Sequence, residues 1–141
     1  VNPFNVDAAK RNLKANDVVG EVVLSDGLYK VSRHHFDLIV SNPPHFPEDP
    51  AGMYPVLTPS ILAGHDAEWA FHRTFYMNCA NGYLQEGGEV WFLENGARDA
   101  EEGVLSVIRA NAALEYLGRE DEPEDPGFFW MMTRRRPLPR L

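Results

Sequence analysis

Residues 36–46 read FDLIVSNPPHF, an apolar run that ends on Ser-Asn-Pro-Pro and continues with His45 and Phe46. Each proline fixes its φ near about −65° and has no N–H to donate. We therefore expect the Asn42 amide and the Pro43 carbonyl to be held rigidly, with acceptors that face one point. Two such acceptors suit an NH2 group, because they can direct its nitrogen lone pair toward an electrophile. A planar side chain that follows, His45 or Phe46, can stack on a planar substrate.

The elements that must position this stretch alternate between helices and strands. Helical spacing predicts one helix from Asn2-Pro3 to the break at Asn16-Asp17, and another from the N-cap Asp66 to about Gly82. A third helix is predicted over about 99–110. The runs with strand character are Glu21–Ser25, Phe36–Ser41, Glu89–Leu93 and, as a hairpin, about 113–118 and 128–133.

This order predicts an α/β sheet with helices on both faces. Phe36–Ser41 is apolar on both sides of its pleat, which is typical of a buried strand in a parallel sheet. Ligands of such sheets bind beyond the carboxyl ends of the strands, where Asp26 and the turn 41–45 are expected. Glu94-Asn95-Gly96 is interpreted as the turn that ends a strand, and His72 as a structural residue. The Pro- and Gly-rich residues 47–65 are expected to form a long binding loop or lid.

The composition fits one globular domain, because 141 residues of which 44% are hydrophobic can bury a single sizeable core. Cys79 is the only cysteine, which excludes an internal disulfide and a Cys-rich metal site. A net charge of −8 argues against broad adhesion to nucleic acid or anionic lipid. There is no signal-peptide layout, membrane-length apolar stretch or His–carboxylate spacing typical of a metal site. We expect a cytoplasmic protein without a membrane or metal partner.

The motif Asn42-Pro43-Pro44-His45 resembles the (D/N/S)-P-P-(Y/F/W) motif of class I S-adenosylmethionine-dependent N-methyltransferases. The resemblance extends to both sides. VNPFNVDAAKRNLKAND is similar to the helix after the family's second strand, SDGLY to the third-strand segment, and LQEGGEVWFLENG to the turn into the fifth strand. These segments follow one another in the family's order and cover almost the whole chain.

The resemblance implies a Rossmann-like sheet, mostly parallel with a C-terminal antiparallel hairpin, and S-adenosylmethionine as the cofactor. The site residues that it implies are Asp26, Gly27 and Asn42 for the cofactor, Asn42, Pro43, Pro44 and His45 for catalysis, and His45 and Phe46 for the substrate. His45 stands where the family has Tyr, Phe or Trp, and its ring offers a smaller stacking surface.

Two cofactor-binding features of the family have no counterpart here. These are the glycine-rich loop after the first strand and the acidic residue that binds the ribose hydroxyls. We therefore expect residues 1–141 to be the C-terminal part of a methyltransferase domain that lacks the first strand or strands. Such a chain is expected to be inactive by itself.

The substrate stays open between two classes. Residues 57–96 are similar in layout to release-factor glutamine methyltransferases, and the acidic net charge slightly favours such a protein substrate. Ribosomal RNA guanine-N2 and tRNA adenine-N6 methyltransferases share the NPP motif, which makes RNA the close alternative. A noncatalytic α/β module, derived from a methyltransferase and acting as a scaffold or partner, is the alternative from a different functional class.

Overall fold

The computed structural model describes residues 3–32, 35–45, 64–96 and 100–137. The chain divides into two compact units, Val1–Arg33 and His34–Leu141, and each is described here by itself. The expectation that residues 1–141 form part of a single methyltransferase domain stays a prediction.

The N-terminal unit contains the helix that the sequence predicts. Helix α1 (Pro3–Ala15) begins at a proline, which tolerates the first turn because it needs no N–H there. The expected strand at 21–25 is wrong, because these residues are irregular in the structure. A strand exists only through backbone pairing with a neighbour, and residues 21–25 do not take part in the described sheet.

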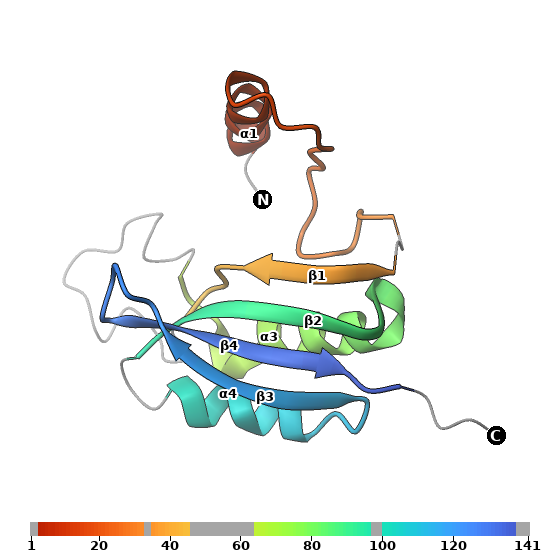
Figure 1. Ribbon diagram of the computed structural model, residues 1–141, viewed down its shortest axis with the longest axis vertical. Helices are drawn as coiled ribbons and strands as arrows, with labels where there is room; N and C mark the ends of the chain where they lie inside the picture. The colour runs from red at the N-terminus through yellow and green to blue at the C-terminus, as the bar shows by residue number, and fades with distance from the viewer. Residues whose placement is uncertain (1–2, 33–34, 46–63, 97–99, 138–141) are drawn as a thin grey trace. The chain divides into compact units, whose positions relative to one another are not determined.

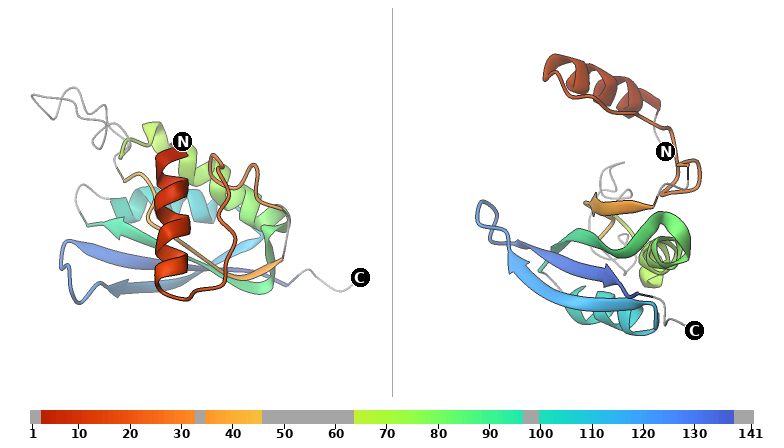
Figure 2. Two further views of the ribbon diagram at one scale, coloured as in Figure 1. Left: turned by 90° about the horizontal axis from the view of Figure 1, so that it is seen from above. Right: turned by 45° about the vertical axis from the view of Figure 1, so that its right-hand side comes forward.

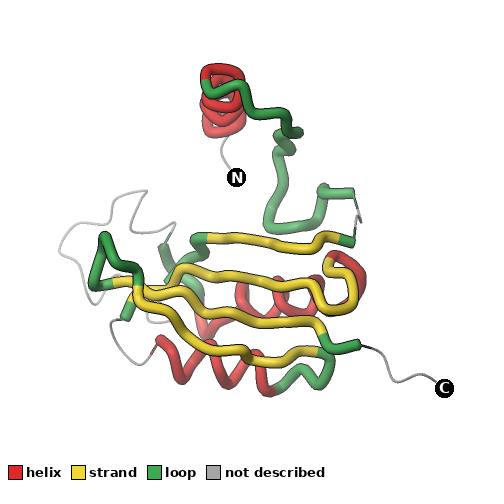
Figure 3. The backbone as a smooth tube through the Cα atoms, in the orientation of Figure 1, coloured by secondary structure: helices red, strands yellow, loops and turns green. Residues whose placement is uncertain are grey.

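A mixed sheet of four described strands forms the centre of the C-terminal unit (Figure 1, Figure 3). Its order is β1 (Phe36–Ser41), β2 (Leu84–Asn95), β4 (Phe128–Arg135) and β3 (Leu114–Asp121). β1 and β2 are parallel, whereas β2–β4 and β3–β4 are antiparallel. The parallel part is therefore a single pair, smaller than expected, and the C-terminal hairpin is confirmed. Because β1 and β2 are parallel, their carboxyl ends meet at one edge of the sheet.

The two α-helices among the described residues of this unit lie on the same face of the sheet (Figure 2). The first helical segment consists of a 3-10 turn η2 (Ala67–Trp69), α3 (Ala70–Asn78) and a π-helical turn η3 (Cys79–Tyr83), and the second is α4 (Ala100–Arg109). The core lies between these helices and the sheet. Its most buried members include Tyr76, Cys79, Val90, Phe92, Val104, Ile108, Phe129 and Met131. Helices on both faces were expected, but within the described part of this unit they cover one.

Because the described helices of this unit cover one face of the sheet, apolar side chains of β1 are exposed on the other face. Leu38 and Val40 are 48% and 55% exposed, so the expected burial of this strand on both sides is wrong. Both side chains have the same parity along β1, and they lie on the face that α3 and α4 do not cover. Apolar composition by itself did not reveal which side of the strand the helices would occupy.

A bulge sets the register between β1 and β2. Phe36 pairs with Leu84 and Leu38 with Glu89, so β2 advances five residues while β1 advances two. Gly88 lies in this bulge, and a Cβ atom there would be 2.7 Å from the carbonyl oxygen of Phe36. The close approach of the two backbones therefore requires glycine.

Candidate functional site

The predicted catalytic motif lies at the carboxyl end of β1. Asn42 directly follows the strand and is exposed, Pro43 is buried, and Pro44 is half-buried. The motif is therefore anchored by its first proline while its amide side chain faces solvent. Phe46, the second expected substrate residue, lies outside the described residues.

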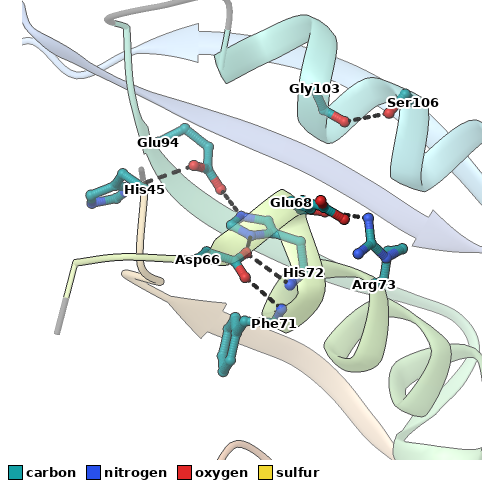
Figure 4. Close-up of polar contacts among 9 residues, drawn as sticks. All are labelled: His45, Asp66, Glu68, Phe71, His72, Arg73, Glu94, Gly103 and Ser106. Carbon is teal, nitrogen blue, oxygen red and sulfur yellow. Dashed lines mark hydrogen bonds and ion pairs between the residues drawn. The ribbon is translucent and has the colours of Figure 1, made fainter. Parts of the chain in front are cut away.

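His45 is held from three directions. Its backbone N–H donates to the carbonyl oxygen of Gly64 at 2.9 Å, and its ring meets Phe128 edge-on, with 5.6 Å between centroids. Nδ1 lies 3.4 Å from Oε2 of Glu94, at the long end of hydrogen-bonding distance (Figure 4). The side chain is 11% exposed. These contacts restrain the orientation of the His45 ring.

Behind His45 a chain of buried ionisable groups runs into the core (Figure 4). The other carboxylate oxygen of Glu94, Oε1, lies 2.8 Å from Nε2 of His72, and Nδ1 of His72 lies 2.5 Å from Oδ2 of Asp66. Asp66, His72 and Glu94 are 3%, 0% and 0% exposed. Charged groups at such depth require partners, and here each carboxylate faces the same imidazole.

The helix start explains why Asp66 lies beside His72. Asp66 accepts hydrogen bonds from the backbone N–H groups of Phe71 at 2.6 Å and His72 at 3.2 Å. The predicted capping role is thus confirmed, although Asp66 caps α3 across the intervening turn η2. Glu68 and Trp69 take left-handed φ values of 52° and 60° there, which turns the chain back toward the helix.

Aromatic rings enclose the imidazole of His72. Trp69 and Phe92 meet it edge-on, with ring centroids 5.1 Å and 5.3 Å away. Phe71 and Tyr76 lie at 6.1 Å and 6.5 Å. These rings exclude water, so the hydrogen bonds of His72 act at low local dielectric.

The electrostatics of the buried chain favour a charged centre. Burial disfavours the imidazolium, but the hydrogen bonds to Asp66 and Glu94 outweigh this effect and hold the pKa of His72 above its ordinary value. Burial also opposes ionisation of Asp66, yet the hydrogen bonds from His72 and from the backbone of Phe71 hold its pKa below the ordinary value. Both ring nitrogens of His72 face carboxylate oxygens, at 2.5 Å and 2.8 Å, an arrangement that favours the protonated imidazole.

A profile of the methyltransferase small domain family matches residues 1–115, which span both units. The chain belongs to the methyltransferase small domain family. Members of this family are generally dependent on S-adenosylmethionine. A search of curated proteins found no match.

Two solved structures share the fold of this family member. A methyltransferase from Pyrococcus furiosus superposes with a TM-score of 0.59 at 16% identity, over 98% of this chain and 60% of that chain. The PH0226 protein from Pyrococcus horikoshii OT3 gives 0.61 at 10% identity, over 96% of this chain and 69% of that chain. The Rossmann-like α/β fold is thereby confirmed. The chain spans about three fifths of the length of the first structure.

Two of the expected cofactor residues of this methyltransferase family member, Asp26 and Gly27, lie in the N-terminal unit. Asp26-Gly27 forms the predicted turn, with the carbonyl oxygen of Asp26 accepting from the N–H of Tyr29 at 3.2 Å and Gly27 at a φ of 50°. The Asp26 side chain is exposed. Asn42 belongs to the other unit, so the joint cofactor role of Asp26, Gly27 and Asn42 stays a prediction.

Sequence reasoning missed the link between Glu94 and His72. The expectation that Glu94 belongs to a turn is wrong, because Glu94 lies within β2. The strand pattern could have predicted the burial of Glu94. Val90, Phe92 and Glu94 are two residues apart and so lie on the same face of the strand, and the first two are core residues. A carboxylate at the third inward position of such a strand requires a buried partner.

Two further properties concern the described residues alone. They contain no group of three or more His, Cys, Asp or Glu side chains arranged to hold a metal ion. Within the same ranges, no helix has the length and apolar character needed to cross a membrane.

Proposed function

We propose that the protein carrying these residues is an S-adenosylmethionine-dependent N-methyltransferase that acts on a planar amide or exocyclic amine nitrogen. The observation that carries this proposal is the placement of the motif. Asn42 is exposed immediately beyond the carboxyl end of β1, where α/β sheets bind their ligands, and the next residue is buried and fixes the backbone.

The residues of the motif have separate roles in this proposal. S-adenosylmethionine, when bound, supplies an electrophilic methyl group. The Asn42 side-chain oxygen and the Pro43 carbonyl accept the two hydrogens of the target NH2 group. These bonds direct the nitrogen lone pair toward the methyl carbon, and they oppose its delocalisation into the π-system. His45 stacks on the planar group that carries the nitrogen.

We favour a glutamine side chain of a peptide release factor as the target, with an RNA base as the alternative. The net charge of −8 supports this order, because a polyanionic RNA would be repelled unless a local basic surface compensated. A decisive assay offers methyl-tritiated S-adenosylmethionine with a purified release factor, ribosomal RNA or tRNA. Digestion and mass spectrometry of the product then identify N5-methylglutamine, N2-methylguanine or N6-methyladenine.

The role of Asn42 is tested with the substrate that the panel identifies. Asn42→Ala should lower kcat by about 10²- to 10³-fold, the usual effect of losing one preorganised polar contact, and leave the KM for the cofactor nearly unchanged. Asn81→Ala is the matched control, because Asn81 is exposed in the middle of η3. Near-normal turnover by Asn42→Ala would refute the assignment. Absence of cofactor binding and of methyl transfer in the full-length protein that carries residues 1–141 would favour the noncatalytic alternative.

A further inference from the structure

The buried chain of Asp66, His72 and Glu94 ends on His45, the motif residue that we expect to contact the substrate. We propose that Glu94 is a positioning residue, whose carboxylate fixes the ring of His45 for binding of the target group. This proposal rests on the proposed function, because it assigns the support of that same site.

The carboxylate of Glu94 is suited to this role because its two oxygens serve different histidines. Oε1 binds Nε2 of His72 and Oε2 faces Nδ1 of His45, at 2.8 Å and 3.4 Å. His72 is itself fixed by Asp66 through its other ring nitrogen, and all three side chains are buried. The hydrogen bond from His72 therefore fixes the orientation of the Glu94 carboxylate, and this carboxylate in turn orients the ring of His45.

The contact also selects a protonation pattern on His45. Oε1 of Glu94 is engaged by Nε2 of His72, and the proposal assigns to Nδ1 of His45 the hydrogen that faces the remaining oxygen, Oε2. A neutral ring is then the Nδ1–H tautomer. At 3.4 Å the contact is long for a hydrogen bond, and catalytic hydrogen bonds commonly tighten in the complex with substrate.

The histidine at position 45, where the family motif has Tyr, Phe or Trp, explains why positioning by Glu94 would be useful. Imidazole presents a smaller face than the Tyr, Phe or Trp rings of the family motif, so it gains less from stacking. Fixing its plane in advance reduces the ordering cost that substrate binding must otherwise meet. A phenyl ring at position 45 would have no N–H for Glu94, and it would be positioned by packing alone.

This difference gives a double-mutant cycle on kcat, measured with the substrate from the methyl-transfer panel. Glu94→Gln should lower kcat about tenfold in the wild-type background, and less than about twofold further in the His45→Phe background. The KM for S-adenosylmethionine should change by less than about twofold throughout. Glu89→Gln is the matched control, because Glu89 lies on the same strand and pairs instead with Arg134 at 2.7 Å. Equal losses in both backgrounds would overturn the proposal, since they would show that Glu94 acts independently of His45.

A measurement on the unaltered chain covers the case in which Glu94→Gln does not fold or no substrate is found. Long-range ¹H–¹⁵N spectra report which nitrogen of each histidine ring is protonated. We expect His45 to carry a hydrogen on Nδ1, and an Nε2–H tautomer with bare Nδ1 would overturn the proposal. Absence of methyl transfer by the full-length protein that carries residues 1–141, together with a protonated Nδ1, would count against the proposed function alone, so the two failures are distinguishable.

Discussion

Replacement of His72 by leucine tests whether the buried charges stabilise the fold as described. His72→Leu keeps an apolar side chain of similar size among the surrounding rings. It removes the only imidazole that contacts both Asp66 and Glu94 within the described residues. Two carboxylates then remain in a region where they are 3% and 0% exposed.

The magnitude follows from that loss. Removing one partner from a buried ion pair typically costs about 3–5 kcal/mol, because the remaining charge stays desolvated. The second carboxylate that loses its partner adds to this cost, the buried leucine offsets about 1–2 kcal/mol of it, and these two corrections roughly cancel. We expect the free energy of unfolding to fall by about 3–5 kcal/mol near neutral to mildly acidic pH.

The pH dependence has a definite sign. The raised pKa of His72 gives stability that is fully present below its ordinary value of 6.5 and is lost as the pH rises through the folded-state value. The lowered pKa of Asp66 gives stability that is present above its ordinary value of 3.8 and is lost as the pH falls through the folded-state value. The difference between wild type and His72→Leu should therefore be greatest between pH 3.8 and 6.5 and smaller on either side.

Urea unfolding followed by tryptophan fluorescence, at several pH values, measures this difference. His35→Leu is the matched control, since His35 is exposed in the same unit and its replacement should change stability by less than about 0.5 kcal/mol. A loss below about 1 kcal/mol for His72→Leu, or a difference that does not vary with pH, would refute the description of His72 as a charged centre.

Two further predictions concern packing. Gly88→Ala should destabilise the chain by about 1–3 kcal/mol, because its Cβ would meet the backbone oxygen of Phe36 at 2.7 Å. Gly127→Ala, in the exposed hairpin turn, is the control and should have little effect. Thermal unfolding of the two variants measures the difference. Equal melting temperatures would show that the β1–β2 bulge relaxes freely. Burial raises the pKa of the Cys79 thiol to about 12, so iodoacetamide at about pH 8 should modify it slowly in the native chain and rapidly in urea. Rapid native modification would contradict the packing of η3.

Local patterns in the sequence determined most of the elements. The helix α1, the strand β1, the capping Asp66, the helix α4 and the C-terminal hairpin all follow from short-range signals: spacing, caps and turns. The strand expected at 21–25 failed because pairing with a distant segment, which a local pattern does not contain, decides whether an extended run becomes a strand. The exposure of Leu38 and Val40 was missed for the same reason, since a helix elsewhere in the chain decides which face is covered.

The candidate site divides in the same way. The sequence by itself located the Asn42 motif and predicted its place at a strand end, because proline restrains the backbone locally whatever surrounds it. Only the tertiary structure brought together His45, Asp66, His72 and Glu94, which come from a loop, a helix cap, a helix and a strand. Each is ordinary in its own segment. Their proximity depends on the parallel register of β1 and β2 and on the packing of α3 against the sheet, and these are contacts between segments far apart in the chain.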